Sequence, residues 1–134
     1  MNTKKLANRV AVITGAGGGL GAECARVLAS HGAKIVVADI NAEAGQLVAE
    51  QIVKLGGEAI SIPTDVSQET SVQAMVNAAM AHFGRIDILY NNAAILSAEQ
   101  RAGDRDVINM DVDAWDRAMA VNLRGAMLCS KHCI

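Results

Sequence analysis

The sequence contains 134 residues, of which 51% are hydrophobic and 19% are charged, and its formal net charge is −2. This length predicts a single domain over residues 1–134, with enough apolar material for a buried core. The absence of a basic excess argues against nucleic acid or an anionic membrane as a partner, and no apolar run approaches the roughly 20 residues of a membrane-spanning helix.

The N-terminal segment MNTKKLANRV contains two lysines but lacks the apolar segment that follows them in a secretory signal. The cysteines Cys24, Cys129 and Cys133 are odd in number, which favours free thiols over a disulfide framework. We therefore expect a cytoplasmic protein.

Four short apolar runs have the composition of strands that are buried on both faces of a sheet. They comprise residues 9–14, 34–39, 58–66 and 85–90. The third strand is expected to leave the sheet near Pro63.

Helical patterns of apolar residues separate these runs. Asn41 and Ser67 are the predicted N-caps of the second and third helices, and Gly84 is predicted to end the third. Residues 97–106 are polar and predict a surface loop. A helix anchored by Trp115 is expected to follow this loop and to run to the end of the sequence.

Strands that alternate with helices indicate an α/β fold with a parallel sheet and helices on both faces. Right-handed crossovers place the four strands in the order 3-2-1-4 of a Rossmann-like, doubly wound sheet. The last helix stops at Ile134 in mid-pattern, and the fourth strand would have no neighbour on its outer side. We therefore expect the fold to be truncated before a fifth strand.

The segment VITGAGGGLGAE, residues 12–23, joins the first predicted strand to the first predicted helix. A helix N-terminus attracts phosphate through its unpaired N–H groups, and glycines let a pyrophosphate approach the backbone. Regular elements flank the glycines on both sides, which disfavours a flexible linker. A P-loop is excluded because Ala22 and Glu23 follow Gly21, where that motif requires lysine and then serine or threonine. The segment therefore predicts a cradle for a pyrophosphate.

Four further features follow at the ends of the predicted strands and in the last helix. The segment TGAGGGLG (14–21) has the form TGxxxGxG, and it is followed by Asp39, by Asp65-Val66, by Asn91-Asn92-Ala93-Ala94 and by Asn122. In this order of motifs the sequence resembles the N-terminal half of the short-chain dehydrogenases/reductases. The family's NNAG motif ends here in Ala94, whose methyl group would face the cofactor.

The resemblance implies a set of dinucleotide-binding residues: Gly15, Gly18, Gly19, Leu20, Gly21, Asp39, Ile40, Asp65, Val66, Asn92, Ala93 and Ala94. The position of Asp39 after the second strand agrees with a carboxylate that accepts hydrogen bonds from the adenosine ribose. No lysine or arginine follows it directly, so NAD is expected in preference to NADP. The alternatives are that Asp39 only begins a turn and that Asp65 only belongs to the cap region of the third helix.

Hydride transfer to or from a carbonyl also needs an acid or base that moves the hydroxyl proton. The resemblance implies that serine, tyrosine and lysine perform this step, and they would lie downstream of Ile134. The one tyrosine, Tyr90, lies in a predicted strand, where packing is its expected role. Asn122 would support the proton relay through its main chain, or else only kink its helix or make a local hydrogen bond.

No metal site is expected. Cys129, His132 and Cys133 lie close together on one helix but lack a fourth ligand for zinc. His31 and His82 lie near predicted helix C-termini, where a partial positive charge is favourable, and a structural role is expected for both.

The sequence therefore predicts the cofactor-binding half of an NAD-dependent oxidoreductase that interconverts a secondary alcohol and a ketone. This half alone is expected to be inactive, and the resemblance implies a homo-oligomeric enzyme with a small-molecule substrate. The alternative is a non-catalytic NAD-binding module that is complete at 134 residues. A methyltransferase-like adenosine binder is disfavoured by the pairing of TGxxxGxG with NNAA.

Overall fold

The computed structural model describes residues 4–134, which form a parallel sheet of four strands. The strands are β1 (Val10–Thr14), β2 (Lys34–Asp39), β3 (Glu58–Pro63) and β4 (Ile88–Tyr90). Their order is β3-β2-β1-β4, so the predicted order is confirmed. In the middle of the sheet Val12 lies opposite Val36 on one side and Leu89 on the other. Residues 1–3, where the segment without a secretory-signal pattern begins, lie outside the described residues.

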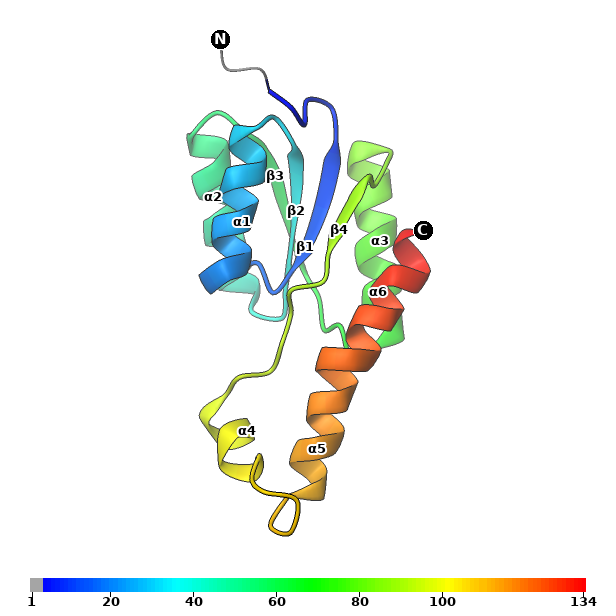
Figure 1. The fold of residues 1–134 in the computed structure, drawn as a ribbon. Helices are drawn as coiled ribbons and strands as arrows, with labels where there is room; N and C mark the ends of the chain where they lie inside the picture. The colour runs from blue at the N-terminus through cyan, green and yellow to red at the C-terminus, as the bar shows by residue number, and fades with distance from the viewer. Residues whose placement is uncertain (1–3) are drawn as a thin grey trace.

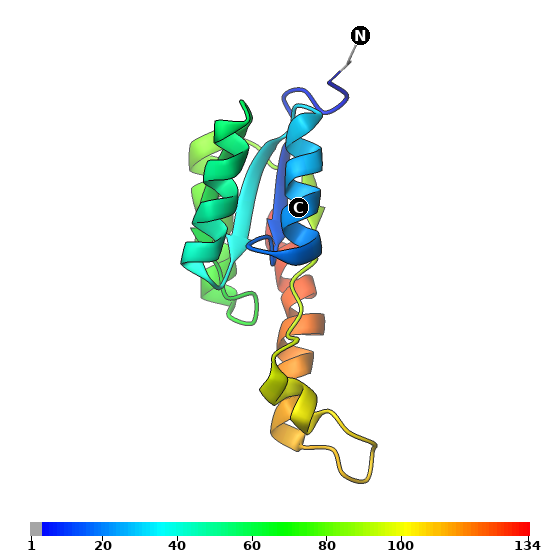
Figure 2. The same cartoon turned by 90° about the vertical axis from the view of Figure 1, so that its left-hand side faces the viewer.

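Helices cover both faces of this sheet (Figure 1, Figure 2). One face is covered by α1 (Gly19–Ser30) and α2 (Ala42–Lys54), and the other by α3 (Glu69–Phe83) and α6 (Gly125–Cys133). Parallel strands joined by crossover helices on both faces form the predicted Rossmann-like, doubly wound architecture.

Successive strand residues point to opposite faces and build two separate cores. Ala11, Ile13, Ile35 and Val37 pack in one core with residues of α1 and α2. Val10, Val12, Val36 and Ala38 pack in the other with residues of α3 and α6. Because both faces of β1 and β2 are covered, these strands read as continuous apolar runs.

The predicted helix ends are partly confirmed. Asn41 is the N-cap of α2, where its side chain accepts a hydrogen bond from the amide of Ala44. Gly84 ends α3 in the left-handed conformation at φ 75°. The prediction for Ser67 is wrong, because Gln68 is the N-cap of α3 and makes no side-chain cap bond. The hydroxyl of Ser67 donates instead to the carboxylate of Asp65.

Three strands are shorter than the predicted ranges, and β1 is so by one residue, since it begins at Val10. β3 ends at Pro63, where the sequence predicted that it leaves the sheet, and the amide of Thr64 still donates to the carbonyl oxygen of Asp39 in β2. β4 begins at Ile88, and the preceding residues Arg85 and Asp87 form an ion pair.

The segment after β4 differs most from the prediction. Residues 98–103, predicted as loop, form the short helix α4 (Ala98–Gly103), whose N-cap Ser97 accepts from the amide of Gln100. The predicted last helix has three parts: α5 (Val112–Ala118), the π-helix η1 (Met119–Arg124) and α6. Trp115 does not anchor it, since 51% of this residue is exposed and Ala114 is the buried residue of α5.

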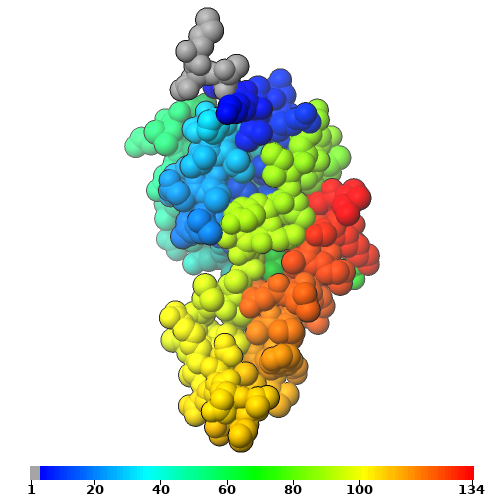
Figure 3. Space-filling model, viewed as in Figure 1, coloured from blue at the N-terminus to red at the C-terminus, as the bar shows by residue number. Residues whose placement is uncertain are grey.

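Residues 96–118, here called the α4–α5 arm, project from the sheet and its helices (Figure 3). Within the arm the side-chain nitrogen Nε2 of Gln100 donates to the carbonyl oxygen of Ala114 over 2.6 Å. A Cβ atom on Gly103 would lie 2.6 Å from that of Ala114, so glycine permits the two helices to pack closely. Across residues 4–134, no helix has the length and apolar character required to cross a membrane.

Candidate cofactor-binding site

A cleft of about 600 Å³ lies where the strands end. Its lining includes every predicted cofactor-binding residue except Gly21. The sequence interpretation missed four lining residues, namely Thr64, Ile95, Leu96 and Val121. Thr64, Ile95 and Leu96 directly adjoin predicted motifs, but nothing in the helical pattern distinguishes Val121. The cleft occupies the crevice at the carboxyl ends of the strands, where open α/β sheets bind ligands.

The glycines that follow β1, in the loop and in the first turn of α1, serve two different purposes. A Cβ atom on Gly18 or Gly19 would meet nothing within 4 Å, so the space over the loop is open at these positions. A Cβ atom on Gly15 would lie 2.9 Å from Cα of Ala93, and one on Gly21 would lie 2.5 Å from the carbonyl oxygen of Gly15. Gly21 is therefore buried against the loop and is not among the residues that line the cleft.

Thr14 and Asn92 join the ends of β1 and β4 beneath this loop. The buried hydroxyl of Thr14 accepts hydrogen bonds from the amides of Asn92, at 3.1 Å, and Ala93, at 3.0 Å. The side-chain amide of Asn92 donates to the carbonyl oxygens of Thr14 and Gly15. These bonds fix the backbone of the predicted motifs on both sides of the cleft.

Asp39 lies at the end of β2, on the rim of the cleft beside the exposed Ile40. Its Oδ2 atom accepts from the amide of Gly17 over 2.8 Å, and its Oδ1 atom accepts from the amide of Asn41 over 2.8 Å. Each carboxylate oxygen can accept more than one hydrogen bond, so both retain capacity for a donor in the cleft.

Asp65 and Val66 form the wall that follows β3. Oδ1 of Asp65 accepts from the amide and the hydroxyl of Ser67, and its own amide donates to the hydroxyl of Ser71. The carboxylate therefore stabilises the turn before α3, in agreement with the cap-region alternative. Val66 is 7% exposed and is backed by Gly125, where a Cβ atom would lie 2.7 Å from Cγ2 of Val66.

Asn122 lies in η1, the π-helical segment between α5 and α6. Its Oδ1 atom accepts from the amide of Ile95 over 3.0 Å, which ties the chain that leaves β4 to the long helix. A π-helical turn in an otherwise α-helical segment frequently marks a functional site. The side-chain amide of Asn91 donates to the hydroxyl of Ser130 in α6, the helix that directly follows η1.

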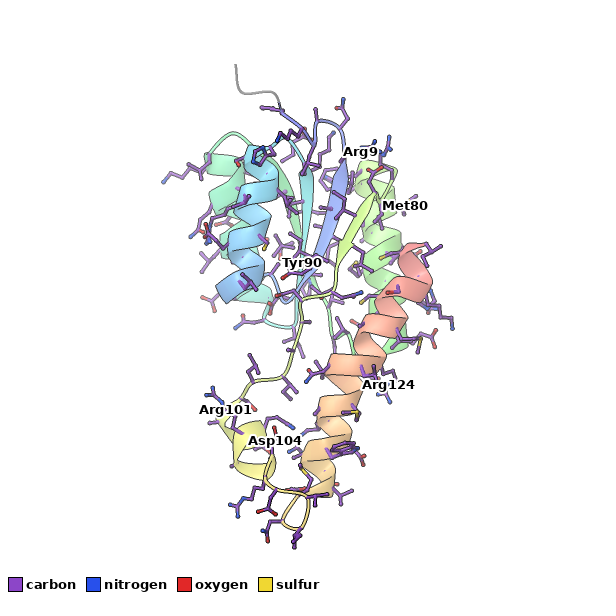
Figure 4. The ribbon with its side chains drawn as sticks, viewed as in Figure 1. Arg9, Met80, Tyr90, Arg101, Asp104 and Arg124 are labelled. Atoms are coloured by element: carbon purple, nitrogen blue, oxygen red, sulfur yellow. The ribbon has the colours of Figure 1, made fainter. Side chains whose placement is uncertain are left out.

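The remaining candidate residues have structural contacts. Tyr90, at the end of β4, packs against the core beneath α1 and α2 (Figure 4). Burial raises the pKa of the Cys129 thiol to about 11, and His132 lies 2.8 Å from a carboxylate oxygen of Glu69. His82 packs edge-on against Phe83. Within residues 4–134, no three His, Cys, Asp or Glu side chains gather as a metal-binding group.

Comparison with known proteins agrees with this geometry. The family model described as short chain dehydrogenase matches residues 9–134. Cis-4-hydroxycyclohexanecarboxylate dehydrogenase of Sinomonas cyclohexanicum is 43% identical over 128 residues, which are 96% of this chain and 49% of that protein.

Two solved structures are similar over nearly the whole chain. A 7α-hydroxysteroid dehydrogenase complexed with NADH and 7-oxo glycochenodeoxycholic acid has a TM-score of 0.87 and 33% identity, covering 98% of this chain and 49% of that one. A 3-ketoacyl-(acyl-carrier-protein) reductase of Brucella melitensis complexed with NADH has a TM-score of 0.86 and 36% identity, and the match covers 97% of this chain and 50% of that one. The chain thus spans about half the length of the relatives that it matches. With its family model, its sheet order and its glycine loop in agreement, this chain belongs to the short-chain dehydrogenase family.

Proposed function

We propose that the chain binds NAD and provides the cofactor-binding part of an oxidoreductase that interconverts a secondary alcohol and a ketone. The observation that carries this proposal is a single cleft in which an open glycine loop and the carboxylate of Asp39 lie side by side at the strand ends. The NADH with which the two similar structures are complexed supports a nicotinamide cofactor.

The residues present fit such a dinucleotide. The space over Gly18 and Gly19 is open, and it adjoins the N-terminus of α1, where free amides and the helix dipole favour a pyrophosphate. Asp39 would accept hydrogen bonds from the ribose, while Val66 and Ile40 would contact the adenine end. Bound NAD would supply the hydride acceptor, and Asn92, Ala93 and Ala94 would line its path towards the nicotinamide.

The preference for NAD over NADP is part of the same proposal. The carboxylate of Asp39 would repel a 2′-phosphate on the ribose. The neighbouring Ile40 has no positive charge that could bind this phosphate. Among residues 4–134, the cleft is lined by no lysine or arginine that could bind that phosphate.

In the proposed oxidoreductase the proton would be moved by residues outside this 134-residue sequence. The family resemblance implies a tyrosine followed by a lysine four residues later, whereas Tyr90 is followed at that distance by Ala94. This observation also favours the second candidate, a non-catalytic NAD-binding module. For the complete enzyme we propose a homo-oligomer. This is supported by the exposed apolar side chains of Trp115 in α5, Leu123 in η1 and Met127 in α6.

The proposal is tested by titration calorimetry of the 134-residue chain with NAD. We expect Asp39→Ala to weaken NAD binding by about tenfold, since hydrogen bonds to a charged group contribute about 1.5–3 kcal/mol. Asp104→Ala removes an exposed carboxylate after α4 and should leave binding unchanged. No binding by the wild-type chain would refute the proposal. Steady NADH formation from NAD and a panel of secondary alcohols would show that residues 1–134 suffice for turnover, against our expectation.

A further inference from the structure

Asp39 is held by the glycine loop as well as by its own turn. The amide of Gly17 donates to Oδ2, and the amide of Asn41 donates to Oδ1, both over 2.8 Å. Hydrogen bonds to a carboxylate are shorter and stronger than bonds between neutral groups. The carboxylate is thereby fixed in position, with one bond from each of two different segments.

The space beside Gly17 is filled by the residues that it contacts. A Cβ atom there would lie 2.9 Å from both Cγ and Oδ2 of Asp39, and 3.1 Å from Cβ of Ala44. Ala44 belongs to the first turn of α2 and is held by the bond from its amide to the side chain of Asn41. Since α2 is fixed there, an added methyl group would displace the carboxylate of Asp39.

Gly17 differs in this respect from the next glycine in the loop. A Cβ atom on Gly18 would meet nothing within 4 Å, so glycine at that position only leaves room above the loop. At position 17 the absence of a side chain leaves room for the carboxylate of Asp39. Gly17 therefore acts on the ribose end of the cleft, although it does not line the cleft.

A fixed carboxylate discriminates between the two dinucleotides more strongly than a mobile one. It can accept hydrogen bonds from two ribose hydroxyls at little entropic cost, because its side chain is already ordered. It cannot turn away from a 2′-phosphate without leaving the amides of Gly17 and Asn41 without their acceptor. Loss of the Gly17 contact would remove both effects.

We propose that Gly17 is a specificity-determining residue, which positions the carboxylate of Asp39 so that it accepts the ribose hydroxyls of NAD and repels the 2′-phosphate of NADP. This inference rests on the proposed function. Gly17 acts through Asp39, so its effect must disappear when Asp39 is absent.

The test compares the dissociation constants of NAD and NADP by titration calorimetry for the full 134-residue chain. Wild-type protein, Gly17→Ala, Asp39→Ala and the double variant form a cycle. We expect Gly17→Ala to reduce the preference for NAD by about tenfold, and to change it little in the Asp39→Ala background. A general distortion of the loop would weaken both dinucleotides equally, because they share the pyrophosphate.

An unchanged preference in Gly17→Ala, or an equal decrease in both backgrounds, would overturn the inference and leave the proposed function intact. If the wild-type chain bound neither dinucleotide, both would fail. Hydrogen exchange of the Gly17 amide keeps the inference testable if Gly17→Ala does not fold. We expect this exchange to become at least ~10-fold faster in Asp39→Ala, as the loss of a charge-assisted hydrogen bond predicts, and an unchanged rate would also overturn the inference.

Discussion

Asp87, the residue before β4, connects this strand to the start of β1, and its carboxylate accepts hydrogen bonds from three residues. Its carboxylate accepts from the side chains of Arg9 and Arg85 and, over 2.9 Å, from the amide of Val10. The hydrogen bond from Arg85, followed by that from Val10, holds the pKa of Asp87 well below its usual value of 3.8. A carboxylate whose pKa is lowered by folding stabilises the protein above its unfolded pKa, and this stabilisation is lost as the pH falls through the folded pKa.

We expect Asp87→Asn to unfold at a lower urea concentration than the wild type at pH 7. The difference between the two midpoints should narrow as the pH falls below 3.8, because Asp87 of the unfolded wild-type chain then takes up a proton while the carboxylate of the folded protein is still held ionised. Urea unfolding between pH 7 and pH 2 measures both effects. The control is Asp104→Asn at an exposed position after α4. A constant difference over this range would show that Asp87 acts by packing and not by its charge.

At the scale of whole elements, the N-caps of α2 and α3 differ in a way that can be measured. Asn41 bonds the amide of Ala44 over 3.0 Å, whereas Gln68 makes no cap bond. Asn41→Ala should lower the free energy of unfolding by about 1 kcal/mol, the usual loss for an N-cap. Gln68→Ala, the matched control at the other cap, should change it by less than about 0.5 kcal/mol. Equal effects in chemical denaturation would contradict this account.

Gly125, the first residue of α6, lies against the wall of the cleft. A Cβ atom there would lie 2.7 Å from Cγ2 of Val66 and 3.3 Å from its carbonyl oxygen. Overpacking costs about 1–3 kcal/mol and exceeds the gain of about 1 kcal/mol from alanine in a helix. Gly125→Ala should therefore lower the thermal unfolding midpoint and weaken NAD binding, as scanning calorimetry and titration would show. Met127→Ala, on the exposed face of α6, should change neither.

The sequence was most informative where the local pattern and the fold agree. The alternation of apolar runs with helical patterns predicted the sheet order, and Asn41 was correctly identified because it directly precedes a long amphipathic helix. Ser67 was misassigned because α3 begins one residue later than predicted, after Gln68, and the hydroxyl of Ser67 bonds the carboxylate of Asp65. Asn122, in the π-helical segment, accepts a hydrogen bond from the amide of Ile95, which is distant in sequence, and no local pattern predicts this contact.

For the molecule as a whole, the α4–α5 arm stands apart from the sheet (Figure 1, Figure 3). Its helices are joined by the bond from Gln100 to the carbonyl oxygen of Ala114, and Gln100 is only 5% exposed. Val107 and Ile108, between α4 and α5, are each 90% exposed. Segments with few buried contacts open more readily than a sheet that is covered on both faces.

We therefore expect amides of the arm to exchange with deuterium faster than those of β1 and β2. Gln100→Ala should accelerate exchange in the arm by roughly tenfold, because a buried hydrogen bond and side-chain packing are lost, while exchange in the sheet should remain unchanged. Gln46→Ala, at an exposed site on α2, serves as the control. Mass spectrometry of peptic fragments measures these rates. If Gln100→Ala accelerated exchange equally in the arm and in β1, the arm and the sheet would unfold together, and the arm would not be a separately opening unit.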